Sequence, residues 1–195
     1  MHHGRMPHPD RRTSDPERIR ALAHPVRLEL LDFLATVEDA TATQCAEHIG
    51  ESVASCSFHL RMLHKYGYIE RAESRGREKP WRVLPGGYDL RPQHDLPSSV
   101  TAVAEVAALH MVRETERVHA FLSTLGREAP EWMEAATVTS ASFWATAEET
   151  AQFSEDLRRL NERFAGRSEN PALRPEGARQ VRMFGTVNPD PKDPS

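Results

Sequence analysis

A serine-rich stretch with one aromatic and several basic residues lies between residues 52 and 65. A helix over residues 53–65 would gather one outward face made of Val53, Ala54, Ser57, Phe58 and Arg61. Small side chains at the start of a helix let it approach base edges in a major groove, and a cation at its end suits a phosphate. An amphipathic surface helix without such a role fits the same pattern. Both interpretations stay open on this stretch alone.

A basic turn follows this stretch. Residues 68–73 and 79–84 are predicted as two short strands around the glycine-bearing turn 74–78. The cations at its tip suit contact with phosphates or with a minor groove, and they are Arg75, Arg77 and Lys79. A charged turn is often only solvated surface, so its position matters. A basic hairpin directly after two helices joined by a tight turn is the arrangement of a winged helix.

The elements that would position these residues are helices. Prolines and capping residues predict helices over 16–23 and 25–36. Thr43 is predicted to cap a helix over 44–50, with Gly50 as its left-handed terminator. Residues 53–67 form the next predicted helix, whose buried stripe is Cys56, Leu60 and Leu63. Two helices joined by a turn that carries glycine are the helix-turn-helix signature.

The segment RIRALAHPVRLELLDFLA, and then AEHIGESVASCSFHLRMLHKYGYIERAESRGREKPWRV, resembles the ArsR-type winged-helix transcription regulators. The resemblance covers residues 15–84. It implies a homodimeric, sequence-specific DNA-binding protein, usually a repressor that an effector releases. It also implies that Ser55, Ser57, His59 and Arg61 lie near DNA. His59 has an alternative role, as a half-buried residue bonded to the backbone or to the wing.

The predicted DNA contacts combine the outward helix face, the positions that the resemblance implies and the basic hairpin. They are Ser52, Val53, Ser55, Ser57, Phe58, His59, Arg61, Lys65, Arg75, Arg77 and Lys79. The expected partner is a palindromic operator in double-stranded DNA, with the helix of each subunit in a successive major groove.

Metal sensing by the route usual in this family is not expected. Its metal-sensing members carry Cys-x-Cys-Asp-Leu-Ala before the recognition helix, and both cysteine positions fall on threonines here, Thr41 and Thr43. Threonine is a poor ligand for soft metals. Cys45 and Cys56 are expected to be core residues, although a redox pair stays an alternative. No metal and no cofactor is predicted.

The C-terminal half begins with a predicted helix from residue 98 to about 125, stopped by Gly126. So long and apolar a helix favours pairing with a second subunit. A strand is predicted near 136–144 and a last strand at 179–184. Between them, Thr146 and Glu149 form a capping box that starts a helix. Its apolar stripe is Thr150, Phe153, Leu157, Leu160 and Phe164.

Four aromatic residues of this half could line an effector pocket, and they are Trp132, Phe143, Trp144 and Phe153. The same aromatic residues could instead complete the core of a dimer, which is the commoner use of aromatic side chains.

The charge distribution matters more than the net charge of −4. A negative total disfavours nucleic acid as a partner, yet residues 57–84 carry +4 and residues 85–195 carry −5. The positive charge therefore falls on the predicted DNA-binding elements. The N-terminal residues lack the apolar core of a secretory signal, and two cysteines cannot frame a disulfide-rich fold. A cytoplasmic protein without membrane segments is expected.

The sequence thus predicts a mainly α fold with a small β wing. A disordered tail (1–14) precedes a winged helix-turn-helix domain (15–84) and a linker (85–97). A helical dimerisation extension with a possible strand-helix-strand unit (98–184) and a flexible tail (185–195) follow. The predicted function is transcriptional regulation, as a homodimeric repressor with an unknown effector. A winged-helix protein-interaction adaptor is the alternative, and an enzyme acting through residues 127–184 is a weaker one, so no enzyme is predicted.

Overall fold

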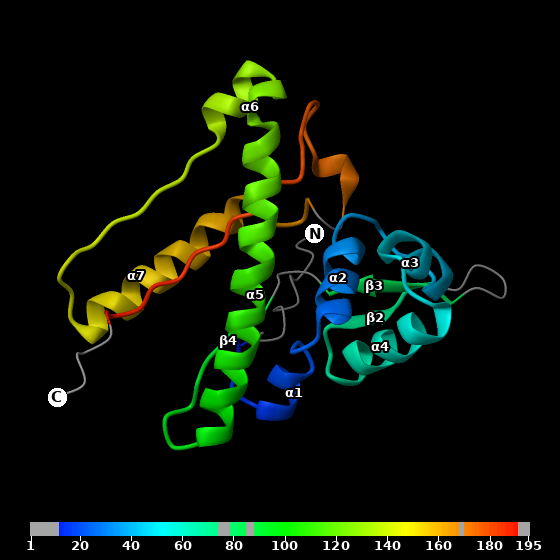
Figure 1. The fold of residues 1–195 in the computed structure, drawn as a ribbon, viewed down its shortest axis with the longest axis horizontal. Coiled ribbons are helices and arrows are strands. Elements are labelled where there is room, and N and C mark those ends of the chain that lie inside the picture. Colours follow the sequence, from blue (N-terminus) through cyan, green and yellow to red (C-terminus); the bar gives the residue numbers. More distant parts are fainter. Residues whose placement is uncertain (1–11, 74–78, 85–87, 168–169, 191–195) are drawn as a thin grey trace, which may run out of the picture. The chain divides into compact units, whose positions relative to one another are not determined.

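The computed structural model describes residues 12–73, 79–84, 88–167 and 170–190, and Figure 1 shows its elements. The chain forms two compact units. The first comprises Met1–Val112 with Gly166–Glu176, and the second comprises Arg113–Ala165 with Gly177–Ser195. Helices dominate both units, and the two small sheets each contain two strands.

The first unit opens with the helices α1 (Pro16–Arg20), α2 (Pro25–Leu34), α3 (Ala42–Ile49) and α4 (Val53–Lys65). Helices α2, α3 and α4, drawn in blue to cyan, lie against one another in Figure 1. Prolines stand at the first position of α1 and α2, where a missing backbone N–H costs nothing. The predicted helical order of this region is confirmed.

The start of α3 differs from its prediction by two residues. Thr41, and not Thr43, is the N-cap, because its hydroxyl accepts from the Gln44 backbone N–H at 3.3 Å. The Gln44 side chain accepts in return from the Thr41 N–H at 2.8 Å. This reciprocal capping box satisfies two donors, which a cap at Thr43 would leave unpaired.

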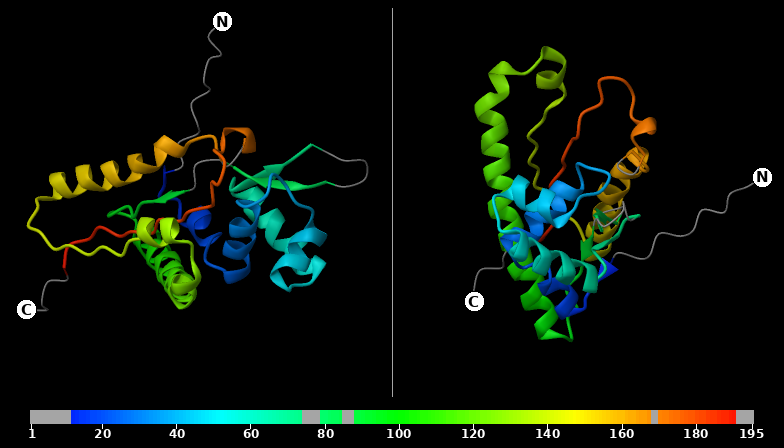
Figure 2. Two further views of the ribbon diagram at one scale, coloured as in Figure 1. Left: turned by 90° about the horizontal axis from the view of Figure 1, so that it is seen from above. Right: turned by 90° about the vertical axis from the view of Figure 1, so that its right-hand side faces the viewer.

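A hairpin follows α4, as predicted. Strands β2 (Ile69–Arg71) and β3 (Trp81–Val83) pair antiparallel, and Figure 2 shows them beside the helices. Ala40, ahead of α3, extends this sheet by a bridge to Trp81, whose backbone both donates to it and accepts from it at 2.8 and 2.9 Å. The turn between the strands, residues 74–78, lies outside the described residues.

A second pair of strands was not foreseen. β1 (Arg12–Thr13) pairs in parallel with β4 (Asp89–Leu90), and the Thr13 carbonyl accepts from the Arg91 N–H at 3.0 Å. These residues were expected to lie in a disordered tail and in a linker. Two-residue strands far apart in the sequence leave no periodic signal, so only the tertiary fold can bring them together. Residues 1–11 of the predicted tail lie outside the described part.

Helix α5 (Pro97–Thr124) has the predicted span, and a 3-10 turn over Leu125–Arg127 ends it. Its first turns bury Ser99, Ala102 and Val106 in the core of the first unit. That core also contains the buried side chains of α1 to α4 and of the hairpin, including Ile19, Leu30, Leu34, Leu60 and Trp81. No helix in the described part of the chain has the length and apolar character of a membrane span.

The second unit contains α6 (Pro130–Ala135) and α7 (Ala147–Arg159), followed by a 3-10 turn over Leu160–Phe164. The capping box predicted for α7 is present, since Thr146 and Glu149 bond reciprocally. A further 3-10 turn, Pro171–Leu173, belongs to the first unit.

The strands predicted near 136–144 and at 179–184 are wrong. Both segments are irregular, and Val138 is 82% exposed. A strand needs a neighbour for its backbone groups, and neither segment pairs with a described part of the chain. A high content of threonine and valine indicates that a segment would pack well in a sheet that is already present. It does not indicate that the segment forms a strand on its own.

Gly50 gives a test of the turn between α3 and α4. Its φ is 74°, and a Cβ there would meet nothing within 4 Å, so an alanine would suffer backbone strain alone. We expect Gly50→Ala to lower the free energy of unfolding by about 1–2 kcal/mol in urea denaturation. Gly126→Ala is the matched control, because that site is equally open but has no positive φ. Equal effects of the two changes would contradict the role assigned to Gly50.

Candidate nucleic-acid interface

The buried side of α4 decides which of its residues face outward. Cys56, Leu60 and Leu63 are completely buried against the core, as predicted. The opposite side presents Phe58, which is 52% exposed, and Arg61, which is also exposed. An apolar stripe fixes the rotation of a helix about its own axis, so the solvent-facing residues are set by this packing.

The turn that leads into α4 contains only Gly50, Glu51 and Ser52. The left-handed conformation of Gly50 lets both its own N–H and that of Glu51 bond to the Ala46 carbonyl, at 3.0 and 3.2 Å. The hydroxyl of Ser52 then accepts from the Ser55 N–H at 3.1 Å. Ser52, one of the predicted DNA contacts, therefore serves as the N-cap of α4.

The remaining residues at the start of α4 lie where the helix is accessible. Val53 is 46% exposed, while Ser55 and Ser57 are half-buried. These short side chains leave the backbone near the surface. A major groove admits a helix of this kind.

Basic residues lie both on α4 and on the hairpin, and those within the described residues include Arg61, Lys65, Arg71 and Lys79. Burial lowers the pKa of the Arg71 guanidinium, and the positive charge of Arg61 lowers it further. Arg71 stacks over the Trp81 ring, 3.4 Å from its centroid, and donates to the Lys79 carbonyl at 2.5 Å. The sequence prediction missed Arg71. Its cross-strand position opposite Trp81 was the available signal.

Lys65 and Lys79 are both exposed. The Lys65 ammonium lies 4.9 Å from the centre of the Tyr66 ring and donates to its hydroxyl at 3.4 Å. The predicted contacts Arg75 and Arg77 lie outside the described residues.

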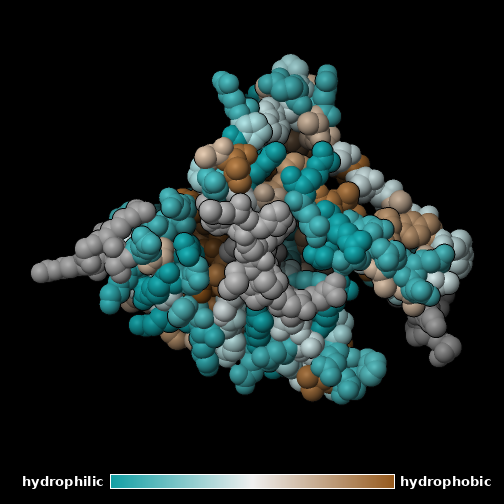
Figure 3. All heavy atoms as spheres, turned by 180° about the vertical axis from the view of Figure 1, so that it is seen from behind, coloured by the Kyte–Doolittle hydropathy of each residue, from teal (hydrophilic) through white to brown (hydrophobic). Residues whose placement is uncertain are grey.

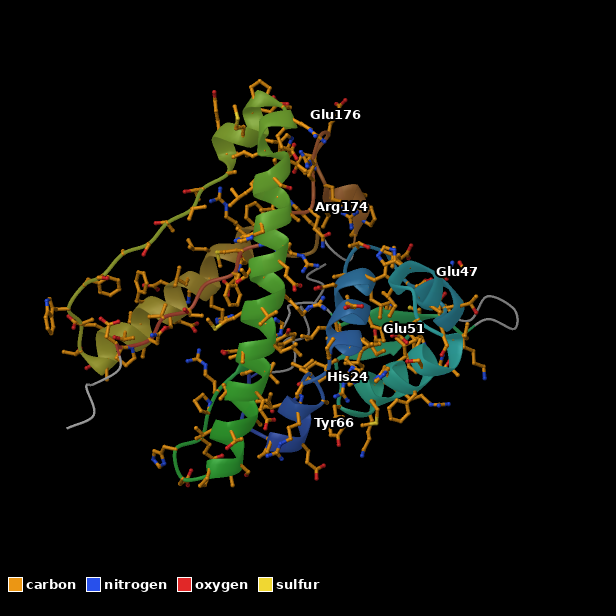
Figure 4. The ribbon with its side chains drawn as sticks, viewed as in Figure 1. His24, Glu47, Glu51, Tyr66, Arg174 and Glu176 are labelled. Atoms are coloured by element: carbon orange, nitrogen blue, oxygen red, sulfur yellow. The ribbon has the colours of Figure 1, made fainter. Side chains whose placement is uncertain are left out.

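His59 differs from the other predicted contacts because it is 8% exposed. Its ring centroid lies 4.4 Å from that of His24, the residue that precedes α2, and Figure 4 labels His24 and nearby Glu51. The Nδ1 atoms of both histidines are buried and have no hydrogen-bond partner among the described residues. This placement supports the alternative of a residue inside the domain, although the predicted bond to backbone or wing is not seen at Nδ1.

Several groups act on the imidazole of His59. Burial lowers its pKa most, the neighbouring His24 and Arg27 lower it further, and the carboxylate of Glu51 opposes them. The folded domain thus takes up a proton on His59 less readily than the unfolded chain does.

We therefore expect acid to weaken the fold through His59. The unfolded pKa of histidine is about 6.5, so this contribution to stability is fully present above that pH. It is lost as the pH falls from about 6.5 toward the lowered folded value. Urea denaturation at about pH 7.5 and about pH 5.5 should show a larger loss for the parent protein than for His59→Gln. His119→Gln, at an exposed position, is the control and should keep the parent's pH dependence. Identical pH dependence in His59→Gln would contradict this role.

Both cysteines belong to the core. Cys45 and Cys56 are free thiols with no exposed surface. Burial raises the pKa of Cys45 to about 12 and also raises that of Cys56, which disfavours the thiolate that metals and oxidants attack. Among the described residues, no three His, Cys, Asp or Glu side chains are grouped so as to hold a metal ion.

The four aromatic residues of the predicted effector pocket do not gather in one place. Phe143 and Phe153 meet edge to face at 5.3 Å. The Arg179 guanidinium lies over the Trp132 ring at 4.8 Å, and Trp144 is fully exposed. In the space-filling view of Figure 3, hydrophobic side chains appear on the surface among hydrophilic ones. The effector site stays a prediction.

Comparison with known proteins identifies the N-terminal part. Residues 22–71 match a family described as a helix-turn-helix domain. The chain is similar to a probable mercury resistance operon repressor of Streptomyces lividans, with 46% identity over 50 residues. That stretch is 26% of this chain and 39% of the relative, so the match covers well under half of the relative's length. These matches confirm the resemblance predicted from the sequence for the helix-turn-helix region.

Solved structures show more distant likenesses. One is the homodimeric winged helix-turn-helix DNA-binding domain of a possible ArsR-family transcriptional regulator from Mycobacterium bovis, at 19% identity. The match covers 52% of this chain and 79% of that domain's chain, with a TM-score of 0.35. Another is a ZitR variant from Lactococcus lactis, at 17% identity. That match covers 77% of this chain and 83% of the ZitR chain, with a TM-score of 0.30. TM-scores this low do not establish a common fold over the compared lengths.

Proposed function

We propose that this chain is a sequence-specific DNA-binding transcriptional regulator, which acts as a homodimeric repressor and is released from its operator by an effector. The observation that carries this proposal is the outward face of α4. A helix held by a buried stripe presents small and apolar residues first and Arg61 next, with Arg71 and Lys79 of the hairpin alongside. A helix that binds in the major groove needs an accessible surface toward the bases and positive charge toward the phosphates.

The geometry of the hairpin supports the same function. Arg71 is held on Trp81, and Trp81 is bonded through its backbone to Ala40 ahead of α3. The hairpin is therefore fixed to the helices that position α4. A cation on a fixed support loses less conformational entropy on meeting a phosphate than one on a free loop.

An exposed stripe on α5 supports homodimer formation. Residues spaced by three, four, seven or eleven positions lie on one face of a helix. On α5 such a row is apolar yet exposed or half-exposed: Val100, Ala104, Ala107, Met111, Val118 and Leu122. A second copy of α5 would remove this stripe from water and place two copies of α4 on one palindromic site.

The type of regulation is inferred from the relative, whose name describes a repressor of a mercury resistance operon. We propose repression for this chain, but not mercury as its effector, because both thiols are buried and their thiolates are disfavoured. We propose that the second unit takes an effector of another chemistry. We assign no catalytic activity to the chain, and we place its action in the cytoplasm, where operators are accessible.

DNA binding should depend on salt. The chain is expected to bind the DNA upstream of its own gene, with an affinity that falls as salt is raised, because binding to phosphates releases their counterions. Arg61→Ala should reduce the slope of log K against log salt by about 0.9 for each subunit, and so by about 1.8 for the bound dimer. Arg127→Ala is the control, since that exposed arginine lies in the other unit. Gel-shift or anisotropy titrations at several salt concentrations measure both. Absence of binding, or binding indifferent to salt, would refute the proposal.

The α5 stripe gives an independent test. Ala107→Asp introduces a charge in the middle of the stripe at an exposed position, so the subunit should still fold. We expect sedimentation to show a shift from dimer to monomer, together with weaker operator binding. Ala120→Asp is the matched control, because that exposed alanine lies on the opposite face of the helix. A dimer that withstands Ala107→Asp would place the interface elsewhere.

A further inference from the structure

Phe58 is a large apolar side chain at the middle of the outward face of α4. It is 52% exposed, and its ring touches the edge of the His59 ring, with centroids 5.2 Å apart. His59 in turn packs against His24 at 4.4 Å. The Phe58 ring thus packs against His59, which is itself packed against His24, while about half of the Phe58 side chain remains exposed.

The neighbours of Phe58 on this face are either small or cationic. Ala54 lies one turn before it and is exposed, and Arg61 lies almost one turn after it. Val53, 46% exposed, adds apolar surface near the start of the helix. The face therefore has an apolar N-terminal half and a basic C-terminal half. Phe58 and Val53 each keep about half of their surface exposed in the subunit.

The chemistry of the major groove gives this apolar surface a specific partner. The thymine 5-methyl group is the apolar group on the groove edge, whereas cytosine presents an amino donor at the neighbouring position. A phenyl ring pressed on a cytosine would leave that donor without a partner, which is costly. The cations of the same face suit the phosphates that flank the groove.

We propose that Phe58, assisted by Ala54, reads thymine methyl groups in the operator, so that each half-site carries at least one thymine under the first turns of α4. This inference rests on the proposed DNA-binding function and adds its base preference. His59 acts through Phe58, because its ring packs edge to face with the ring that meets the base.

The test removes the methyl group alone. In the operator that the chain protects, each thymine is replaced in turn by deoxyuridine, which keeps the same hydrogen-bonding groups. We expect affinity to fall three- to fivefold per methyl at one or more positions of each half-site, which corresponds to about 0.8 kcal/mol. Phe58→Ala should bind more weakly and should no longer distinguish the two DNAs at those positions.

Two further variants complete the design. Phe58→Gln keeps a long side chain at this exposed helical position and should also lose the methyl preference, so it decides the matter if Phe58→Ala fails to fold by circular dichroism. Lys65→Ala is the control, because a phosphate contact should weaken both DNAs equally and leave the preference intact.

The possible outcomes distinguish a failure of thymine recognition from a failure of DNA binding. Salt-dependent binding that ignores every deoxyuridine would overturn thymine reading and leave DNA binding standing. Thymine reading is equally overturned if Phe58→Gln keeps the methyl preference, or if Phe58 proves to wedge between bases and bend the DNA without any methyl effect. Failure of the parent protein to bind DNA at low salt would overturn both.

Discussion

The rotation of α4 about its own axis is the constraint on which the interface depends. Three completely buried side chains, Cys56, Leu60 and Leu63, hold that rotation against the core. A turn of the helix by one residue, about 100°, would bury Phe58 and expose core positions. The side chains proposed to meet DNA are therefore specified indirectly, by the residues on the opposite side. Burial of apolar surface is the dominant stabilising term of such a small domain, and here it fixes which residues of α4 face outward.

The hairpin depends on a second constraint, centred on Trp81. Its backbone bridges to Ala40, its ring is buried, and Arg71 stacks over the ring at 3.4 Å. This single residue links the segment before α3 to the strands after α4. Arg71 of the hairpin is thus held on a residue that is tied to the helices, and we propose that it acts together with Arg61 on DNA. The distribution of charge, +4 over residues 57–84 within a chain of −4, then has a structural basis.

Sequence reasoning succeeded where local signals and core packing agree. The order of helices, the left-handed Gly50, the hairpin and the buried stripe of α4 all have short-range causes, and the structure has them where they were expected. It failed where pairing is long-range. The β1–β4 ladder joins residues nearly eighty positions apart, and the predicted strands at 136–144 and 179–184 lack partners in the described part of the chain. Strand propensity is a property of single residues, whereas a strand is stable only when its backbone pairs with a neighbouring strand.

What the sequence determined alone is the presence of a helix-turn-helix with a basic hairpin, because prolines, caps and a 3.6-residue apolar period act within a few residues of one another. Tertiary structure decided the function of individual polar side chains. Ser52 became a cap, His59 a buried support, and Arg71 a cation held on Trp81. The identity of a polar residue fixes which bonds it can form, but burial and the distance to partners fix which of those bonds exist, and both depend on packing between elements.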